Sequence, residues 1–193
     1  MLETIGGARS GEDLRSLVEH ALRFKNLMAF VPRRYDPALV EQMALSGALD
    51  PALSDAARAE KLQATATRLQ SSDPDTEWSA RVLKDGKVQF SRLWRGVTDV
   101  HEIDGRFLTS TEAHKLHGLA AAQAETYSSP VRLVKAGDAG GDSEDEASDG
   151  AEGDVEELTR DADDAINRPT QLLEAVLAAG RKGLSVQRYK GLG

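Results

Sequence analysis

The fold class of this chain follows from one stretch of sequence, Trp78-Ser79-Ala80-Arg81-Val82-Leu83-Lys84-Asp85-Gly86-Lys87-Val88-Gln89-Phe90-Ser91-Arg92-Leu93-Trp94. Apolar and polar side chains alternate on both sides of Asp85-Gly86, which is the period of a β-strand. Asp-Gly suits the positive φ angles of a type I′ turn, so the stretch predicts an antiparallel hairpin. A second Asp-Gly at Asp104-Gly105, between Val97–Ile103 and residues 106–109, predicts further antiparallel strand.

Outside this hairpin the apolar residues repeat at the three- and four-residue spacing of α-helices. Helices are expected at residues 11–25, Pro37–Ser46, 55–69, 111–126 and from Pro169 onward. Further strands are expected at residues 131–134 and 184–189. The sequence therefore predicts an α+β domain, with helices at the N-terminal end, a central antiparallel hairpin or small sheet, and a helix and strand at the C-terminal end.

The net charge of −8 is divided unevenly along the chain. Of the 32 acidic and 24 basic residues, residues 138–164 hold 13 and one, so this acidic tract carries −12 and the rest of the chain +4. The tract has almost no apolar residues and is expected to be a disordered acidic loop. We accordingly divide the chain into a main body at 1–135, the acidic loop at 136–166 and a C-terminal helix and strand at 167–193.

The acidic tract admits three interpretations. Calcium binding does not fit, because Ala147 stands where an EF-hand loop counted from Asp142 needs glycine, and no glutamate follows at its twelfth position. The tract could instead mimic nucleic acid and compete for a basic surface, or it could be a solvated spacer, which is the favoured interpretation.

A chain of 193 residues without cysteine has the size of one domain and excludes both disulfides and cysteine-based zinc sites. No window is long and apolar enough to span a bilayer. The N-terminal residues Met1-Leu2-Glu3-Thr4 lack the basic and apolar regions of a signal peptide. We therefore expect a cytoplasmic protein that does not contact a membrane.

The end of the chain, residues 188–193, is basic and rich in glycine. Arg188, Tyr189 and Lys190 offer two cations and an aromatic ring, and Gly191 and Gly193 leave backbone N–H groups uncovered for a phosphate. These five residues are the candidates for proximity to DNA, and an exposed basic strand end is the alternative. The chain stops on a bare Leu-Gly, as a segment cut from a longer protein would.

Two other basic clusters are candidates for contact with DNA or with a partner protein. Arg33, Arg34 and Tyr35 lie between two expected helices. Arg181 and Lys182 lie at the end of the last helix, where the helix dipole favours cations. For the first cluster the alternative is a solvated loop whose tyrosine is anchored in the core.

Neither catalytic nor metal-binding residues are predicted. Ile5-Gly6-Gly7 lacks the Lys-Ser/Thr that completes a phosphate-binding loop, and no serine lies in a nucleophile-elbow pattern. His114 and His117 have a spacing that can ligate metal, but no third ligand accompanies them. We expect both histidines to be at the surface or half-buried.

The last residues, Gln187-Arg188-Tyr189-Lys190-Gly191-Leu192-Gly193, resemble the segment that closes the TOPRIM (metal-binding) domain of type II topoisomerases, in particular the B subunits of bacterial gyrases. Residues 12–39 look like the start of the large insertion within the TOPRIM domain of proteobacterial gyrase B subunits. Residues 170–193 look like the return from that insertion into the TOPRIM core. The resemblance is weak in the hairpin region, and the acidic tract departs from the family.

The resemblance implies that this chain is the insertion of such a protein and is inactive alone. The TOPRIM motifs that hold Mg²⁺, of the Glu-Gly-Asp-Ser and Asp-x-Asp-x-x-Gly types, are missing, and Asp161-Ala162-Asp163-Asp164 resembles the second only superficially. Mg²⁺ and ATP are therefore expected in the parent enzyme, with no cofactor on this chain. The implied partners are the rest of the gyrase B subunit, the gyrase A subunit and double-stranded DNA.

The function implied by the resemblance is to brace the TOPRIM domain and to modulate DNA binding and subunit communication during ATP-dependent negative supercoiling. The alternative is a regulatory module whose acidic loop competes for a basic DNA-binding surface. Because both ends of an insertion rejoin one core, we expect the N-terminal and C-terminal ends of the chain to lie close together.

Overall fold

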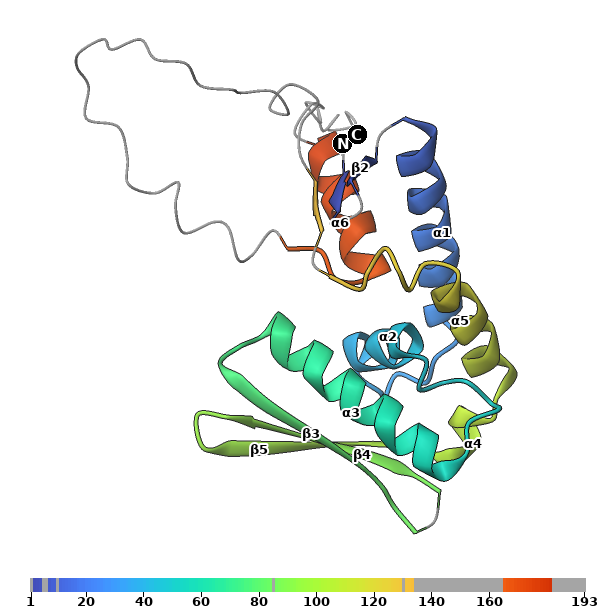
Figure 1. Cartoon of the computed structure of the whole chain (residues 1–193), viewed down its shortest axis with the longest axis vertical. Helices are drawn as coiled ribbons and strands as arrows, with labels where there is room; N and C mark the ends of the chain where they lie inside the picture. Colours follow the sequence, from blue (N-terminus) through green and yellow to red (C-terminus); the bar gives the residue numbers. More distant parts are fainter. Residues whose placement is uncertain are drawn as a thin grey trace, which may run out of the picture.

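The computed structural model describes residues 2–4, 7–9, 11–84, 86–129, 131–133 and 165–181. The expected α+β class is confirmed, and the elements follow one another along the chain as in Figure 1. The helices are α1 (Glu12–Met28), α2 (Pro37–Ser46), α3 (Asp55–Ser72), α4 (Gly105–Leu108), α5 (Thr111–Ala121) and α6 (Pro169–Arg181). The strands are β1 (Leu2–Thr4), β2 (Gly7–Arg9), β3 (Thr76–Val82), β4 (Val88–Trp94), β5 (Val97–Ile103) and β6 (Arg132–Leu133).

The predicted hairpin is confirmed as β3 and β4, which pair antiparallel with Ala80 opposite Phe90. The two-residue turn predicted at Asp85-Gly86 is wrong, because Val82 lies opposite Val88 and the Leu83 N–H donates to the Lys87 carbonyl at 2.8 Å, so the connection is one residue longer. β5 continues the sheet on the other side of β4, so the order is β3-β4-β5. The turn between β4 and β5 holds only Arg95 and Gly96, whose φ angles of 49° and 81° are those of a type I′ turn. Helix α3 packs along β3 and covers one face of this sheet (Figure 1).

The strand expected after the second Asp-Gly is wrong, because Asp104-Gly105 begins the short helix α4 instead. Asp104 is extended, with φ −68° and ψ 143°, and its carboxylate accepts a hydrogen bond from the Tyr35 hydroxyl at 2.9 Å. The helical turn that follows buries Phe107 and Leu108 together in the core. A strand would point these neighbours to opposite faces of a sheet, so burial of both favours the helix.

Local caps account for where several helices begin. The Asp36 carboxylate accepts from the Leu39 N–H at 3.1 Å, and the predicted bounds of α2 are confirmed. The hydroxyls of Ser54 and Ser110 accept in the same way from residues three positions on and begin α3 and α5. Three ends were misjudged: α1 extends beyond the predicted residue 25 to Met28, α3 extends beyond the predicted residue 69 to Ser72, and α5 stops at Ala121, before the predicted residue 126.

A second small sheet joins parts of the chain that are distant in sequence. Its order is β2-β1-β6, and β1 pairs with β6 through Leu2 opposite Leu133. Val131 and Ile166 exchange backbone hydrogen bonds of 2.8 Å on either side of the acidic tract. Helix α6 packs against α1, so β1, β2, α1 and α6 gather at one end of the molecule (Figure 1).

Two predicted features fall on parts of the chain for which the structure gives no description. The expected acidic loop, 136–166, lies outside the described residues except for Ala165 and Ile166, and Ile166 is buried and paired with Val131. The expected strand at 184–189 lies wholly outside them. Both therefore stay predictions.

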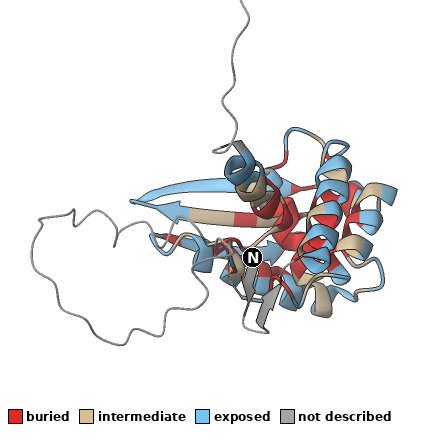
Figure 2. Ribbon diagram, turned by 90° about the horizontal axis from the view of Figure 1, so that it is seen from above, coloured by how far each residue is buried: buried red, intermediate tan, exposed pale blue. Residues whose placement is uncertain are grey.

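Among the described residues, one hydrophobic core connects the helices with the β3-β4-β5 sheet. Figure 2 shows the buried residues gathered where helices face one another and the sheet. The largest fully buried side chains include Phe24, Leu39, Met43, Leu62, Phe90, Leu116, Tyr127 and Leu172. Within the described residues, no helix is both long and apolar enough to cross a membrane.

Candidate functional site

The structure leaves the C-terminal candidates untested. Arg188, Tyr189, Lys190, Gly191, Gly193 and Lys182 lie outside the described residues. Arg181 is the last residue of α6, and only its backbone is described. The proposed proximity of this end to DNA therefore stays a prediction.

Arg33, Arg34 and Tyr35 lie between α1 and α2, and the structure uses two of them internally. Tyr35 is 4% exposed and packs against Phe107, with ring centroids 5.2 Å apart. Arg34 forms an ion pair with Asp104 and donates to the Tyr35 hydroxyl at 2.8 Å. Arg33 is exposed, so it is the cation of this cluster that is best placed to meet a partner.

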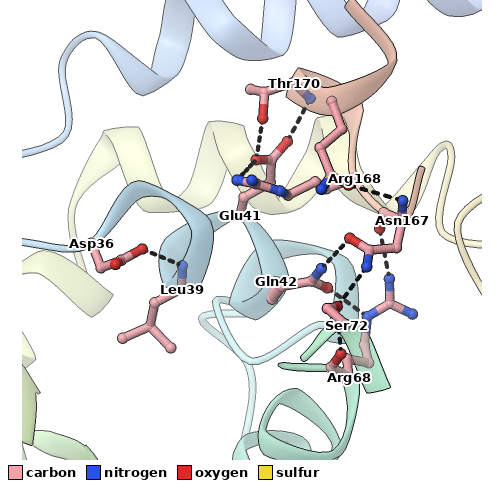
Figure 3. Close-up of polar contacts among 10 residues, drawn as sticks. Asp36, Leu39, Glu41, Gln42, Arg68, Ser72, Asn167, Arg168 and Thr170 are labelled. Atoms are coloured by element: carbon pink, nitrogen blue, oxygen red, sulfur yellow. Dashed lines mark hydrogen bonds and ion pairs between the residues drawn. The ribbon is translucent and has the colours of Figure 1, made fainter. Parts of the chain in front are cut away.

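A cluster of hydrogen bonds and one ion pair attaches the start of α6 to α2 and α3 (Figure 3). We call it the α6 clamp and define it by seven residues. They are Glu41, Gln42, Arg68, Ser72, Asn167, Arg168 and Thr170. The clamp joins residues that are as many as 129 positions apart in the sequence.

Glu41 holds the first turn of α6 from outside that helix. It is 1% exposed, and its carboxylate accepts from the Thr170 backbone N–H at 2.8 Å and from the Thr170 hydroxyl at 2.6 Å. Arg168 adds an ion pair at 3.4 Å. A carboxylate at this position satisfies a backbone donor that the helix itself leaves unpaired, and it lies at the positive end of the helix dipole.

The electrostatics of Glu41 combine two opposing effects. Burial raises the pKa of the Glu41 carboxyl, because the charged form loses its hydration. The hydrogen bonds from Thr170 and the positive charge of Arg168 oppose that rise. The net result is a raised pKa for Glu41, so the effect of burial exceeds that of the hydrogen bonds and of the Arg168 charge.

Arg68 on α3 completes the clamp by donating three hydrogen bonds. Its guanidinium donates to the Gln42 side-chain oxygen at 2.8 Å, to the Tyr127 carbonyl at 2.7 Å and to the Asn167 carbonyl at 3.2 Å. Gln42 in turn donates to the Asn167 side chain at 3.0 Å. Planar guanidinium geometry suits this task, because one side chain satisfies acceptors from three segments.

Sequence reasoning missed the clamp, although one signal for it was present. Glu41 and Gln42 interrupt an otherwise apolar helix, and seven residues of α2, these two included, are buried. A polar pair in such a helix requires partners from elsewhere in the fold. Those partners lie beyond the acidic tract, so their identity could not be read from local pattern.

The described residues offer no group of three or more His, Asp or Glu side chains placed to hold a metal ion. His114 is exposed, whereas His117 is partly buried and lies 4.0 Å from the Asp50 carboxylate.

Comparison with known proteins places the whole chain alongside one segment of a larger protein. The DNA gyrase B subunit of Caulobacter vibrioides (strain NA1000 / CB15N) is 31% identical over 193 residues, which are 100% of this chain and 20% of that protein. Its counterpart in Rickettsia bellii (strain RML369-C) is 24% identical over 188 residues, 95% of this chain and 20% of that protein.

The counterpart in Rickettsia conorii (strain ATCC VR-613 / Malish 7) is 22% identical over 187 residues, again 95% of this chain and 20% of that protein. No protein-family model matches the chain. The chain therefore spans 20% of the length of each of these curated relatives.

Proposed function

This chain is a relative of one segment of the DNA gyrase B subunit, and we propose that it is the insertion within the TOPRIM domain of such a protein, which it braces. In the whole enzyme it modulates DNA binding and communication between subunits during ATP-dependent negative supercoiling. Its partners are the rest of the gyrase B subunit, the gyrase A subunit and double-stranded DNA. The chain supplies no catalytic group, and the Mg²⁺ and ATP of the reaction are bound by other parts of the enzyme.

The observation that carries this proposal is the way the two ends of the described chain are held together. β1 pairs with β6, α1 packs along α6, and the α6 clamp fixes the first turn of α6 on the body. A domain fastened in this manner transmits a displacement at one end of α6 to its core as a rigid unit. That behaviour is what a brace between two points of one TOPRIM core requires.

A supercoiling assay tests the proposal with a whole gyrase B subunit that carries this segment, combined with its gyrase A partner. Glu41→Ala, which breaks the clamp, is expected to lower the supercoiling rate severalfold. Glu41→Gln serves as the matched control and is expected to stay near the unmodified rate. Deleting residues 138–164 is expected to leave the rate unchanged, because a brace does not need the acidic tract.

The distribution of charge favours one second candidate, in which the acidic tract competes with DNA for a basic surface. Residues 138–164 carry −12 in a chain whose remainder carries +4. This candidate predicts the opposite result in the supercoiling assay: deletion of the tract changes the rate, and Glu41→Ala does not.

Fluorescence anisotropy of labelled duplex DNA across a salt series tests the second candidate directly. If the tract masks a basic surface, the 138–164 deletion binds DNA with a log–log salt slope that steepens by about 0.9 for each phosphate contact, and the full chain does not. If neither protein binds, competition for DNA within this chain is excluded, and the brace acts through protein contacts.

A further inference from the structure

β5 forms an edge of the β3-β4-β5 sheet, and among the described strands it pairs with β4 alone. Val97 and Val100 are 60% and 54% exposed, and they lie on opposite faces of the strand. Next to them on β4, Trp94 and Leu93 are 40% and 38% exposed. The strand has neither proline nor lysine, two residues with which proteins commonly block such an edge.

The turn fixes which backbone groups of β5 point outward. In a two-residue hairpin the residues that flank the turn form a hydrogen-bonded pair, here Trp94 with Val97. Because the pattern alternates, residues 97, 99, 101 and 103 direct their N–H and C=O groups toward β4. Thr98, Val100 and Glu102 direct theirs toward the uncovered edge. Three consecutive donor–acceptor pairs are thus offered to another strand.

The sequence of β5 is complementary to itself when the strand is reversed. Only one antiparallel register pairs all seven residues with a second β5, and it places Val100 opposite Val100 on a two-fold axis. In that register Val97 faces Ile103, Asp99 faces His101 and Thr98 faces Glu102. Apolar residues meet apolar residues, and no carboxylate faces another carboxylate.

The hydrogen-bonding pattern agrees with this same register. The residues that point outward, Thr98, Val100 and Glu102, pair with one another across the axis, so every donor meets an acceptor. A register shifted by one residue would oppose outward groups to inward ones and lose the ladder. The edge is uncovered in the described structure, because β5 is the terminal strand in the order β3-β4-β5 and residues 97–100 are exposed.

We propose that β5 is a self-association edge, where a second copy of this chain adds its own β5 antiparallel about an axis at Val100 to form a continuous six-stranded sheet. The second strand covers Val97 and Val100 on both faces of the edge. Val100 of one copy then meets Val100 of the other on the face of the sheet away from α3, the same face on which Leu93 lies. Association of this kind is isologous, so it closes at two copies.

The first test is sedimentation equilibrium of the full chain over a concentration series. The weight-average mass is expected to rise from one chain of 20.8 kDa toward two. Val100→Lys places two lysines opposite each other on the axis and is expected to weaken association at least tenfold. Thr98→Lys is the matched control on the same strand and face, and it retains association because the new lysine faces Glu102 of the other copy.

The second test uses the absence of cysteine from the chain. Val100→Cys places two thiols on the axis, where paired residues have Cα atoms about 5.5 Å apart, within the range of a disulfide. Mild oxidation is expected to produce a covalent dimer. Thr98→Cys is the control, because in this register the two thiols lie about 14 Å apart along the strand and cannot bond.

Circular dichroism of each variant checks that the sheet is retained, which is expected because the substituted side chains are exposed. A chain that stays monomeric throughout the series, with Val100→Cys linking no faster than Thr98→Cys, would overturn the proposal. So would a dimer that Val100→Lys leaves unchanged, because its interface would then lie elsewhere.

Discussion

Glu41→Ala is expected to lower the free energy of unfolding by about 3 kcal/mol, which is the cost of removing one partner from a buried charged network. The substitution leaves the Thr170 N–H, the Thr170 hydroxyl and the Arg168 guanidinium without their acceptor. Urea unfolding followed by circular dichroism measures the loss. Hydrogen exchange should also show that the first turn of α6 loses protection before the rest of the fold.

Glu41→Gln is the matched control, because its amide keeps an oxygen for the Thr170 N–H. It is expected to cost about 1 kcal/mol, the ordinary scale of one hydrogen bond. If Glu41→Ala costs no more than Glu41→Gln, the carboxylate does not hold α6, and the role assigned to the clamp is wrong.

The difference in stability between the unmodified chain and Glu41→Gln is expected to depend on pH, and its direction follows from the pKa of Glu41. Burial raises the pKa of Glu41 in the folded chain above the value of 4.5 that it has when exposed. Such a group contributes stability that is fully present below pH 4.5 and is lost as the pH rises through the higher folded value. The stability of the unmodified chain relative to Glu41→Gln should therefore increase as the pH is lowered from 7 toward 4.5.

Arg68→Ala is the second substitution with a large expected effect, again about 3 kcal/mol of unfolding free energy. It removes the donors for Gln42, for the Tyr127 carbonyl and for the Asn167 carbonyl in one step. Burial lowers the pKa of Arg68, yet a guanidinium remains charged at neutral pH, so the lost bonds are charge-assisted.

Arg68→Lys separates the charge from the geometry. An ammonium group keeps the charge but cannot reach three acceptors in the plane of a guanidinium, so a loss of about 1.5 kcal/mol is expected. Denaturant unfolding of the two variants should rank them in that order. Equal losses would show that charge alone does not support the clamp without the guanidinium plane, and negligible losses in both would show that Arg68 does not support it at all.

Coupling between the two sites is a further consequence of the shared clamp. Glu41 and Arg68 hold adjacent parts of the same segment, residues 167–170, so their separate losses should not add. Once either substitution has released that segment, the second removes fewer hydrogen bonds that still stabilise the fold. The double variant is therefore expected to lose less than the sum of the two single variants.

Local chemistry was enough to predict much of the fold. The alternation on both sides of Asp85-Gly86 predicted the β3–β4 hairpin, and Asp36, Pro37 and Gly47 marked α2 at its observed bounds. These signals act within a few residues, through turn geometry, helix capping and the period of apolar side chains. They do not depend on the rest of the molecule, so the sequence carries them in full.

Where the local sequence was equally compatible with two structures, contacts with distant residues determined which of them formed. Asp104-Gly105 satisfied the rule for a hairpin turn, but Tyr35, 69 positions earlier, binds the Asp104 side chain, and the core takes both Phe107 and Leu108. The outcome depended on a partner and a core position that no short window contains. Four residues are also too few for periodicity to distinguish a helical turn from a strand.

The candidate site depends even more on contacts between distant residues than the fold does. Residue pattern was sufficient to establish an α+β domain with an acidic tract, and it carried the resemblance that the comparisons with the gyrase B subunit support. Only the folded structure reveals that Glu41 and Arg68 form hydrogen bonds with residues 167–170, which follow that tract in the sequence. Hydrogen bonds require atoms to be about 3 Å apart, and for residues more than a hundred positions apart the whole fold sets that distance.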